Sequence, residues 1–185
     1  MARKKSVSYS QFSLWEQCPY SWKLQYVDKA IPWSDNIYTL FGTAMHETIQ
    51  SLLQVMYNDS AVKANDMDLE KILLDEMAKE YKKMMAVYGV KFTTKDQMNE
   101  FFDDGIQILD LLKKNRAVYF STRTMKLVGV ELPIYYPASE DNKNIMMKGF
   151  LDLVFENTSD NTIEIWDIKT STKGWNKWQK ADKTK

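Results

Sequence analysis

The sequence predicts an α+β fold in which N-terminal helices pack on a mostly antiparallel sheet. Up to about residue 120, apolar residues recur at helical spacing in several long segments. From Met125 onward, short apolar segments separated by polar turns are typical of strands. The polar turn at residues 157–161 joins the last two of these segments into a hairpin. Helices followed by a meander therefore predict an α+β arrangement.

The first helical region is dense in aromatic residues and contains a break. It covers residues 8–26, where Ser8 or Ser10 can cap the first helix. Pro19 lacks the N–H group that a helix interior requires, so we expect two helical pieces. This corner is expected to pack into the core and to be followed by a loop over residues 28–40.

Three longer helices are expected at residues 41–58, 66–88 and 94–120. Gly89 is a natural end for the second, and Thr94 can cap the third. The predicted core positions of these helices are Met45, Ile49, Leu52, Leu53, Met56, Leu69, Ile72, Leu73, Met77, Tyr81, Met84, Met98, Phe101, Phe102, Ile106, Leu109 and Leu112. The acidic residues Glu100, Asp103, Asp104 and Asp110 are expected on the solvent face of the last helix.

Three strands are predicted after the helices, at residues 125–136, 144–156 and 162–170. Pro133 cannot donate a hydrogen bond to a neighbouring strand, so it predicts an edge position or a bulge. The composition is globular, with 44% hydrophobic and 27% charged residues. A chain of 185 residues can bury one core. We therefore expect a single domain over residues 1–185.

Composition and charge exclude several classes of protein. The formal net charge is zero, with 25 basic and 25 acidic residues, which argues against a protein that coats DNA through charge alone. No run of about 18 apolar residues is present to span a membrane, and the basic N-terminus lacks a secretory apolar segment. One cysteine cannot build a disulfide framework. These features predict a cytoplasmic protein (in the host cytoplasm if a phage encodes it) with no membrane partner.

An acid and a lysine lie within the last predicted strand. In an extended segment, Ile163, Ile165, Asp167 and Lys169 share one face. Burying a carboxylate and an ammonium group beside isoleucines is costly unless they are paired or bind something. Asp167 and Lys169 are therefore either an ordinary ion pair or part of a metal and phosphate site.

Two further residues fit the second interpretation. Asp152 lies in an apolar run of the preceding strand, and strand pairing would bring it beside Asp167. Two close carboxylates repel, and a divalent cation with oxygen ligands removes that cost. His46 lies on the buried side of its helix or at its edge, as a core histidine or as a nitrogen ligand. With Lys169, these residues are the parts that metal-assisted phosphodiester hydrolysis needs.

Four sequence blocks resemble the PD-(D/E)XK nuclease superfamily, in its RecB-like exonuclease branch. That branch includes the nuclease domains of RecBCD- and AddAB-type helicase–nucleases and the RecB-like CRISPR-associated exonucleases. The blocks are Ser8-Tyr9-Ser10 with Cys18-Pro19-Tyr20 and Tyr26, then Phe41 to His46, Gly149 to Asp152, and Asp167-Ile168-Lys169-Thr170-Ser171. They look like the Ser-x-Ser…Cys-Pro, Gly-x-x-x-His, Gly-x-x-Asp and Asp-x-Lys-Thr motifs of that branch. Each block is loose, but four in order are specific.

The resemblance implies a restriction-endonuclease-like core and a site for Mg²⁺ or Mn²⁺. The implied metal ligands are His46, Asp152, Asp167 and the backbone carbonyl of Ile168. Lys169 would be the catalytic lysine, acting with both aspartates. Glu131 is a secondary candidate, because relatives often carry an acid on the preceding strand. A histidine ligand favours manganese, since imidazole suits softer ions than magnesium.

Two features depart from the family pattern. Iron–sulfur members use three further cysteines near the C-terminus, whereas Cys18 is alone here, so no iron–sulfur cluster is expected. The family also continues into a Gln-x-x-x-Tyr helix, but Lys183 lies four residues after Gln179. We therefore expect a fragment or natural truncation that ends before this helix. It would leave one sheet face uncovered, which favours homo-oligomers.

The C-terminal stretch is rich in lysine and tryptophan. Its candidates for binding nucleic acid are Lys173, Lys177, Trp175 and Trp178. Lysines can track a phosphate backbone, and tryptophans can stack on bases. The alternatives are a solvated tail for the lysines and packing on the missing helix for the tryptophans.

The resemblance implies a divalent-metal-dependent DNA nuclease, specifically an exonuclease, in recombination, repair or phage DNA metabolism. The expected partners are DNA and a helicase or recombination protein. The alternative is a non-catalytic module of the same fold that binds DNA ends or a helicase partner. A third interpretation is a truncated protein that binds metal without cleaving DNA.

Overall fold

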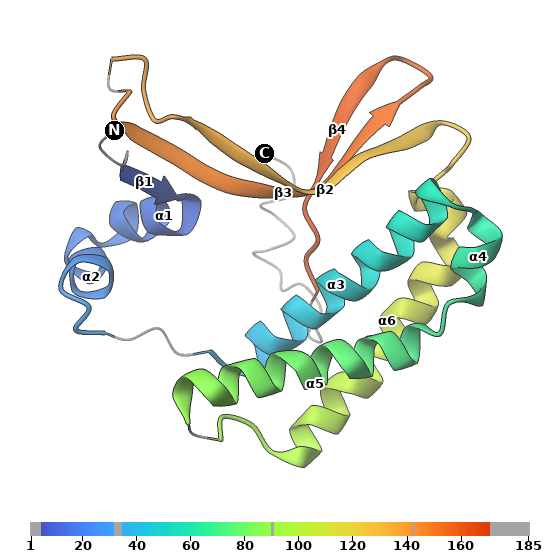
Figure 1. The fold of residues 1–185 in the computed structure, drawn as a ribbon, viewed down its shortest axis with the longest axis horizontal. Helices are drawn as coiled ribbons and strands as arrows, with labels where there is room; N and C mark the ends of the chain where they lie inside the picture. The colour runs from blue at the N-terminus through green and yellow to red at the C-terminus, as the bar shows by residue number, and fades with distance from the viewer. Residues whose placement is uncertain (1–4, 32–34, 90, 142, 171–185) are drawn as a thin grey trace. The chain divides into compact units, whose positions relative to one another are not determined.

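The computed structural model describes residues 5–31, 35–89, 91–141 and 143–170 (Figure 1). The chain packs as two compact units. The first contains Met1–Ser34 and Lys126–Asp167, and the second contains Asp35–Met125 and Ile168–Lys185. The first unit holds the sheet and the second holds the long helices. The single domain expected over residues 1–185 stays a prediction.

The described part of the second unit is helical. Its elements are α3 (Ile37–Asn58), α4 (Ala61–Asp66), α5 (Leu69–Tyr88) and α6 (Lys95–Tyr119). Each helix begins at a residue whose side chain accepts hydrogen bonds from first-turn N–H groups; these residues are Asn36, Ser60, Asp68 and Thr94. Gly89 ends α5 with a left-handed φ of 65°. The predicted cap at Thr94 and the predicted end at Gly89 are therefore confirmed.

Two helix boundaries differ from the prediction. α3 begins at Ile37, inside the segment predicted as a loop, because Asn36 Oδ1 accepts hydrogen bonds from Tyr38 N and Thr39 N. A separate helix, α4, precedes α5, because Met67 is extended with φ −65° and ψ 130°. In both cases a capping residue sets the start of the helix: Asn36 starts α3 earlier than predicted, and Asp68 starts α5 after the break at Met67.

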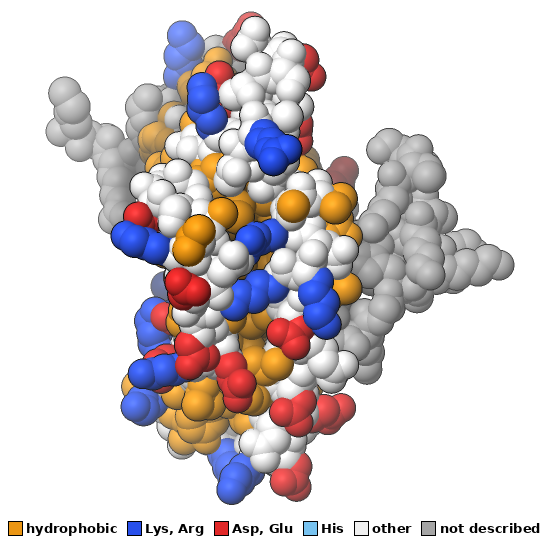
Figure 2. All heavy atoms as spheres, turned by 90° about the vertical axis from the view of Figure 1, so that its right-hand side faces the viewer, with side chains coloured by type: hydrophobic (Ala, Val, Ile, Leu, Met, Phe, Trp, Pro, Cys, Tyr) orange, Lys and Arg blue, Asp and Glu red, His pale blue; other side chains and the backbone are white. Residues whose placement is uncertain are grey.

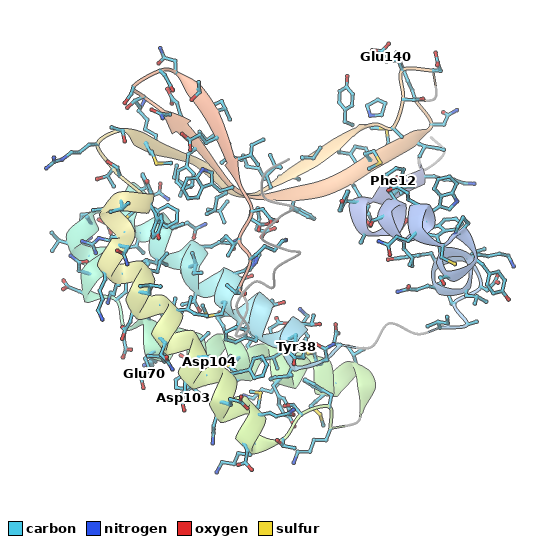
Figure 3. The ribbon with its side chains drawn as sticks, turned by 180° about the vertical axis from the view of Figure 1, so that it is seen from behind. Phe12, Tyr38, Glu70, Asp103, Asp104 and Glu140 are labelled. Atoms are coloured by element: carbon cyan, nitrogen blue, oxygen red, sulfur yellow. The ribbon has the colours of Figure 1, made fainter. Side chains whose placement is uncertain are left out.

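The predicted apolar stripes form the core of the helical unit. The buried members are Met45, Ile49, Leu52, Leu53, Met56, Leu69, Leu73, Met77, Met84, Phe101 and Leu109. The rings of Phe41 and Phe101 meet edge to face at 5.3 Å and join α3 to α6. Figure 3 labels Asp103 and Asp104 on α6; the first is exposed and the second is half-buried. No helix in the described residues is long and apolar enough to cross a membrane.

Two helical glycines have opposite surroundings, which gives a matched test of packing. A Cβ atom at Gly105 would lie 2.6 Å from Leu73 Cδ2 and 3.1 Å from Phe41 Cε2, whereas one at Gly42 would meet nothing within 4 Å. We expect Gly105→Ala to lower the free energy of unfolding by about 1 kcal/mol, since overpacking outweighs the gain in helix propensity. We expect Gly42→Ala to raise it by about 0.5–1 kcal/mol. Urea unfolding of both variants measures the contrast, and equal effects would contradict the close packing at Gly105.

The first unit holds a mixed sheet of four strands in its described residues. They are β1 (Lys5–Ser8), β2 (Met125–Pro137), β3 (Ile145–Asn157) and β4 (Thr162–Trp166). β3 lies between β1 and β2, and β4 also pairs with β3. β1 runs parallel to β3, and β4 runs antiparallel to it. The α+β class is confirmed, and β2 has the edge position that Pro133 predicts.

The sequence does not predict β1, and it extends β4 too far. β1 is the four-residue segment Lys-Ser-Val-Ser, which is too short and polar to show an apolar pattern. β4 ends at Trp166, so Asp167 to Thr170 lie outside the sheet. The predicted strand over residues 162–170 is therefore wrong in its second half.

The aromatic corner has the predicted helical break. α1 (Tyr9–Gln17) is capped by Ser8, whose hydroxyl accepts a hydrogen bond from Gln11 N at 3.3 Å. α2 (Pro19–Trp22) follows and continues into a π-helical turn, η1 (Lys23–Val27). No residue of α1 or α2 is buried, which differs from the expected packing into the core. The Phe12 ring, labelled in Figure 3, stacks instead on Trp15 at 6.5 Å.

Candidate metal centre

The β3–β4 hairpin places two of the predicted acids at the same end. Its last paired residues are Leu153 and Trp166. Asp152 precedes the first of these and Asp167 follows the second, so both aspartates lie one position beyond the ladder. This is the arrangement that strand pairing was expected to give. The Phe155 and Trp166 rings meet edge to face at 5.8 Å and fix the hairpin directly beside this end.

A third carboxylate comes from β2. The ligand oxygens of Glu131 and Asp152 lie within 4.8 Å of one another. Glu131 has a φ of 50°, a left-handed conformation that costs a non-glycine residue about 1–2 kcal/mol. Pro133 lies two residues further on, and it predicts a bulge or an edge in this strand. The strained backbone therefore occurs where the strand presents a carboxylate next to Asp152.

The second unit holds the predicted histidine against the predicted carbonyl. His46 lies half-buried on α3, next to the fully buried Met45. Its Nε2 is 2.6 Å from the carbonyl oxygen of Ile168, so this nitrogen donates a hydrogen bond when it carries the proton. Two atoms that were predicted as ligands of one ion are thus in direct contact. Ile168 lies two residues after the end of β4 at Trp166.

The Asp-x-Lys segment is not buried in the way the sequence predicts. Ile163 and Ile165 are each 60% exposed, and Asp167 and Lys169 are exposed as well. The less exposed face of β4 carries Glu164 and Trp166, which are both half-buried. The interpretation of a costly acid and lysine beside buried isoleucines is therefore wrong, because both isoleucines lie on an exposed face of the strand.

A sequence model of the PD-(D/E)XK nuclease superfamily matches residues 6–184. The chain belongs to this superfamily. PD-(D/E)XK proteins are nucleases as a class and typically use divalent metal ions. A comparison with curated proteins gives no match. The RecB-like branch and the expected truncation stay predictions.

The donor atoms of this PD-(D/E)XK protein suit a hard divalent ion. The sheet unit offers the carboxylates of Glu131, Asp152 and Asp167, and the helical unit offers His46 Nε2 and the Ile168 carbonyl. The carboxylate oxygens of the sheet unit fit Mg²⁺ or Mn²⁺ rather than a thiolate-preferring metal, and within the helical unit an imidazole nitrogen is a donor that also suits Mn²⁺. Among the described residues, the Thr170 hydroxyl is buried without a hydrogen-bond partner, so this segment also has an unused polar group.

Several predicted residues of the PD-(D/E)XK chain lie outside the described residues. They are Lys173, Trp175, Lys177 and Trp178, together with Ser171, Gln179 and Lys183. Their predicted roles stay predictions. Sequence reasoning gave Glu131 only a secondary place, although Pro133 already marked an irregular strand. Gly129, two residues before Glu131, is a second signal, since a Cβ there would lie 2.6 Å from Leu132 Cδ2.

The strained backbone at Glu131 gives a stability test that is independent of activity. We expect Glu131→Gly to be more stable to unfolding than Glu131→Ala by about 1 kcal/mol, because only glycine adopts a positive φ without strain. Both variants remove the same carboxylate and its contacts, so their difference isolates the backbone. Thermal and urea unfolding measure it. Equal stabilities would show that the left-handed conformation is absent in solution.

Proposed function

We propose that this chain is a divalent-metal-dependent deoxyribonuclease of the RecB-like branch. In this proposal it acts as an exonuclease in recombination, repair or phage DNA metabolism. The observation that supports it most is the carboxylate of Asp152 beside that of Glu131, at the hairpin end that also carries Asp167. Acids held this close repel one another, and a bound cation removes the repulsion.

The proposed metal ligands are His46, Asp152, Asp167 and the Ile168 carbonyl, with Glu131 as a further candidate. Asp167 and Ile168 are consecutive residues, so one peptide bond joins the carboxylate at the hairpin end to the carbonyl that contacts His46. When bound, Mg²⁺ or Mn²⁺ polarises a phosphate and lowers the pKa of a coordinated water. To bind the ion, His46 Nε2 would carry no proton, so it would no longer donate a hydrogen bond to the Ile168 carbonyl.

Lys169 is the proposed catalytic lysine. Its ammonium group is exposed and follows Asp167 by two residues, so it is accessible to a DNA phosphate. An ammonium group there donates hydrogen bonds to a phosphate oxygen or to the attacking water. It also offsets the negative charge that develops as the phosphodiester bond breaks. These interactions strengthen in the transition state, which is what accelerates the reaction.

The test is cleavage of end-labelled linear DNA by the purified protein with Mn²⁺ or Mg²⁺. We expect cleavage by the wild type, loss of cleavage in EDTA, and loss in Asp152→Asn. Asp110→Asn changes an exposed acid on α6 and should cleave normally. Resistance of covalently closed circular DNA would distinguish exonuclease from endonuclease action. A wild type that neither cleaves DNA nor binds Mn²⁺ in isothermal titration would sink the proposal.

The proposed partners follow from this function. DNA is the substrate, and a helicase or recombination protein is the proposed protein partner. Homo-oligomers are a further expectation, because Phe150, Ile163 and Ile165 on β3 and β4 are exposed apolar residues. Sedimentation of the wild type and of Ile163→Lys would test that expectation. A variant that is less associated than the wild type would support an apolar sheet contact.

A further inference from the structure

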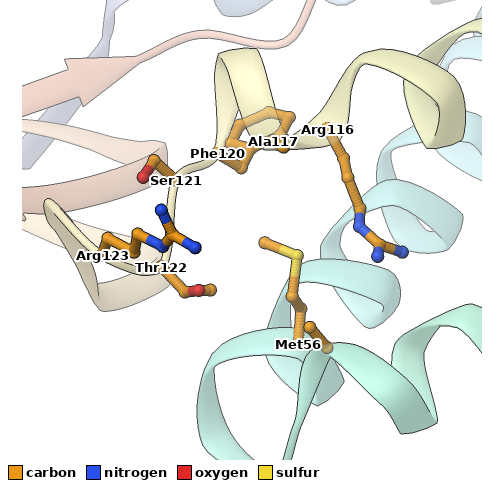
Figure 4. A pocket seen from close by; sticks show the side chains of 8 residues that line it. Met56, Arg116, Ala117, Phe120, Ser121, Thr122 and Arg123 are labelled. Carbon is orange, nitrogen blue, oxygen red and sulfur yellow. The ribbon is translucent and has the colours of Figure 1, made fainter.

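A hollow beside the C-terminal end of α6 gathers two arginines. It has a volume of about 340 Å³ and lies between this helix end, α3 and α4 in the helical unit. Its polar lining comes from Arg116, Ser121, Thr122 and Arg123, and Met56 forms part of its apolar wall. Figure 4 shows Arg116 on one side and Arg123 on the other, with the Met56 side chain between them.

The charge of this hollow is one-sided. None of the residues that line it is acidic. Within the described ranges, neither guanidinium group takes part in an ion pair or a side-chain hydrogen bond. Lys and Arg side chains also gather across the middle of the face in Figure 2, with acidic side chains mainly below them. Two like charges around one hollow repel each other, and a bound anion removes that repulsion.

The choice of arginine is informative in this chain. The sequence contains only three arginines, against 22 lysines, and two of the three line this hollow. A guanidinium group presents a planar fork of N–H donors that matches two oxygens of a phosphate, whereas an ammonium group acts as a point charge. The hydroxyls of Ser121 and Thr122 add neutral donors of the kind that contact phosphates. This donor set fits phosphate better than a carboxylate-lined cation site.

We propose that this hollow binds a backbone phosphate of a nucleic-acid strand, away from the bond that is cleaved. That the phosphate belongs to a nucleic-acid strand rests on the proposed nuclease function. The preference of the hollow for phosphate rests on its arginine and hydroxyl donors. Met56 lies ten residues after His46 on α3, which is about 15 Å along the helix axis. A duplex advances about 3.4 Å per base pair, so this distance corresponds to roughly four nucleotides. The hollow would therefore hold a strand several nucleotides from His46, which is one of the proposed metal ligands.

Binding of fluorescein-labelled single-stranded DNA in EDTA tests the inference without any cleavage. We expect the double variant Arg116→Gln/Arg123→Gln to bind a 20-nucleotide strand about ten- to a hundredfold more weakly. The slope of log Kd against log salt should become shallower by about 0.7 for one lost phosphate contact. Lys114→Gln is the matched control, because it removes an exposed charge from the same helix without lining the hollow. Arg116→Lys/Arg123→Lys keeps the charge and loses the fork, so it should bind with intermediate affinity.

The binding measurements test the phosphate site in the hollow, whereas cleavage measurements test the proposed nuclease function. Equal losses in the double variant and in Lys114→Gln would overturn it, because they would indicate general charge rather than a site. Arginine-dependent binding of inorganic phosphate or of a mononucleotide, with strand binding unchanged, would overturn the assignment to a strand. Matching melting temperatures and far-ultraviolet circular dichroism show that the variants are folded. Failure of Asp152→Asn to abolish cleavage would instead contradict the nuclease proposal and leave these binding results standing.

Discussion

Replacing Lys169 with alanine is expected to lower Mn²⁺-dependent DNA cleavage by about a hundred- to a thousandfold. This is the usual cost of losing one preorganised donor to a transition-state charge. Mn²⁺ affinity should stay close to that of the wild type, because the ammonium group is not a ligand. Asp167→Asn should differ, with weaker metal binding as well as lost cleavage. Single-turnover cleavage at saturating Mn²⁺ and isothermal titration separate the two effects.

The matched control for this prediction is Lys82→Ala, which removes an exposed lysine from α5. It should leave cleavage unchanged. Equal activity of Lys169→Ala and the wild type would contradict the catalytic role of Lys169. Loss of metal affinity in Lys169→Ala, to the extent seen in Asp167→Asn, would indicate that the lysine only supports the metal ligands.

Phe155→Ala is expected to have the largest effect on stability in the sheet unit. The Phe155 side chain is fully buried on β3 and packs edge to face against Trp166 at 5.8 Å. Truncating a buried phenylalanine removes its transfer free energy and leaves a cavity, together about 3–5 kcal/mol. Because Trp166 directly precedes Asp167, we also expect Mn²⁺ affinity to fall in the fraction that remains folded.

Phe150→Ala provides the comparison on the same strand. Its side chain is 66% exposed, so its truncation should change the free energy of unfolding by less than about 0.5 kcal/mol. Chemical denaturation followed by tryptophan fluorescence measures both variants. Similar stabilities of the two would show that the β3–β4 hairpin does not pack through Phe155.

The helical core could be predicted because its signal is local. Stripes such as Met45, Ile49, Leu52 and Leu53 recur at helical spacing, and burial of one helix face requires that spacing. Thr94 and Gly89 mark their helix ends through caps that a few adjacent residues define. Two other helix starts could not be predicted from their adjacent residues. Asn36 and Asp68 are also caps, but the sequence pattern predicts a loop over residues 28–40 and a helix that begins near residue 66.

The site could be predicted only in part, because its contacts join distant segments. Asp152 and Asp167 followed from the pairing of consecutive strands, which requires only the turn between them. The contact between His46 and Ile168 joins residues 122 positions apart, and no local pattern specifies it. The end of β4 at Trp166 could not be placed from β propensity, because Ile168 and Thr170 are β-branched residues that favour a longer strand. Likewise, no residue type predicts the left-handed φ of Glu131.

That backbone conformation has a consequence for anyone who engineers this protein for heat resistance. Lys29, Glu131 and Asn161 are the described non-glycine residues with positive φ, and a standard redesign would replace each of them with glycine. At Lys29 and Asn161 this exchange trades only a surface side chain. At Glu131 it would remove a carboxylate that lies beside Asp152 while raising the melting temperature. Selection for stability alone would therefore act against a carboxylate of the proposed metal centre.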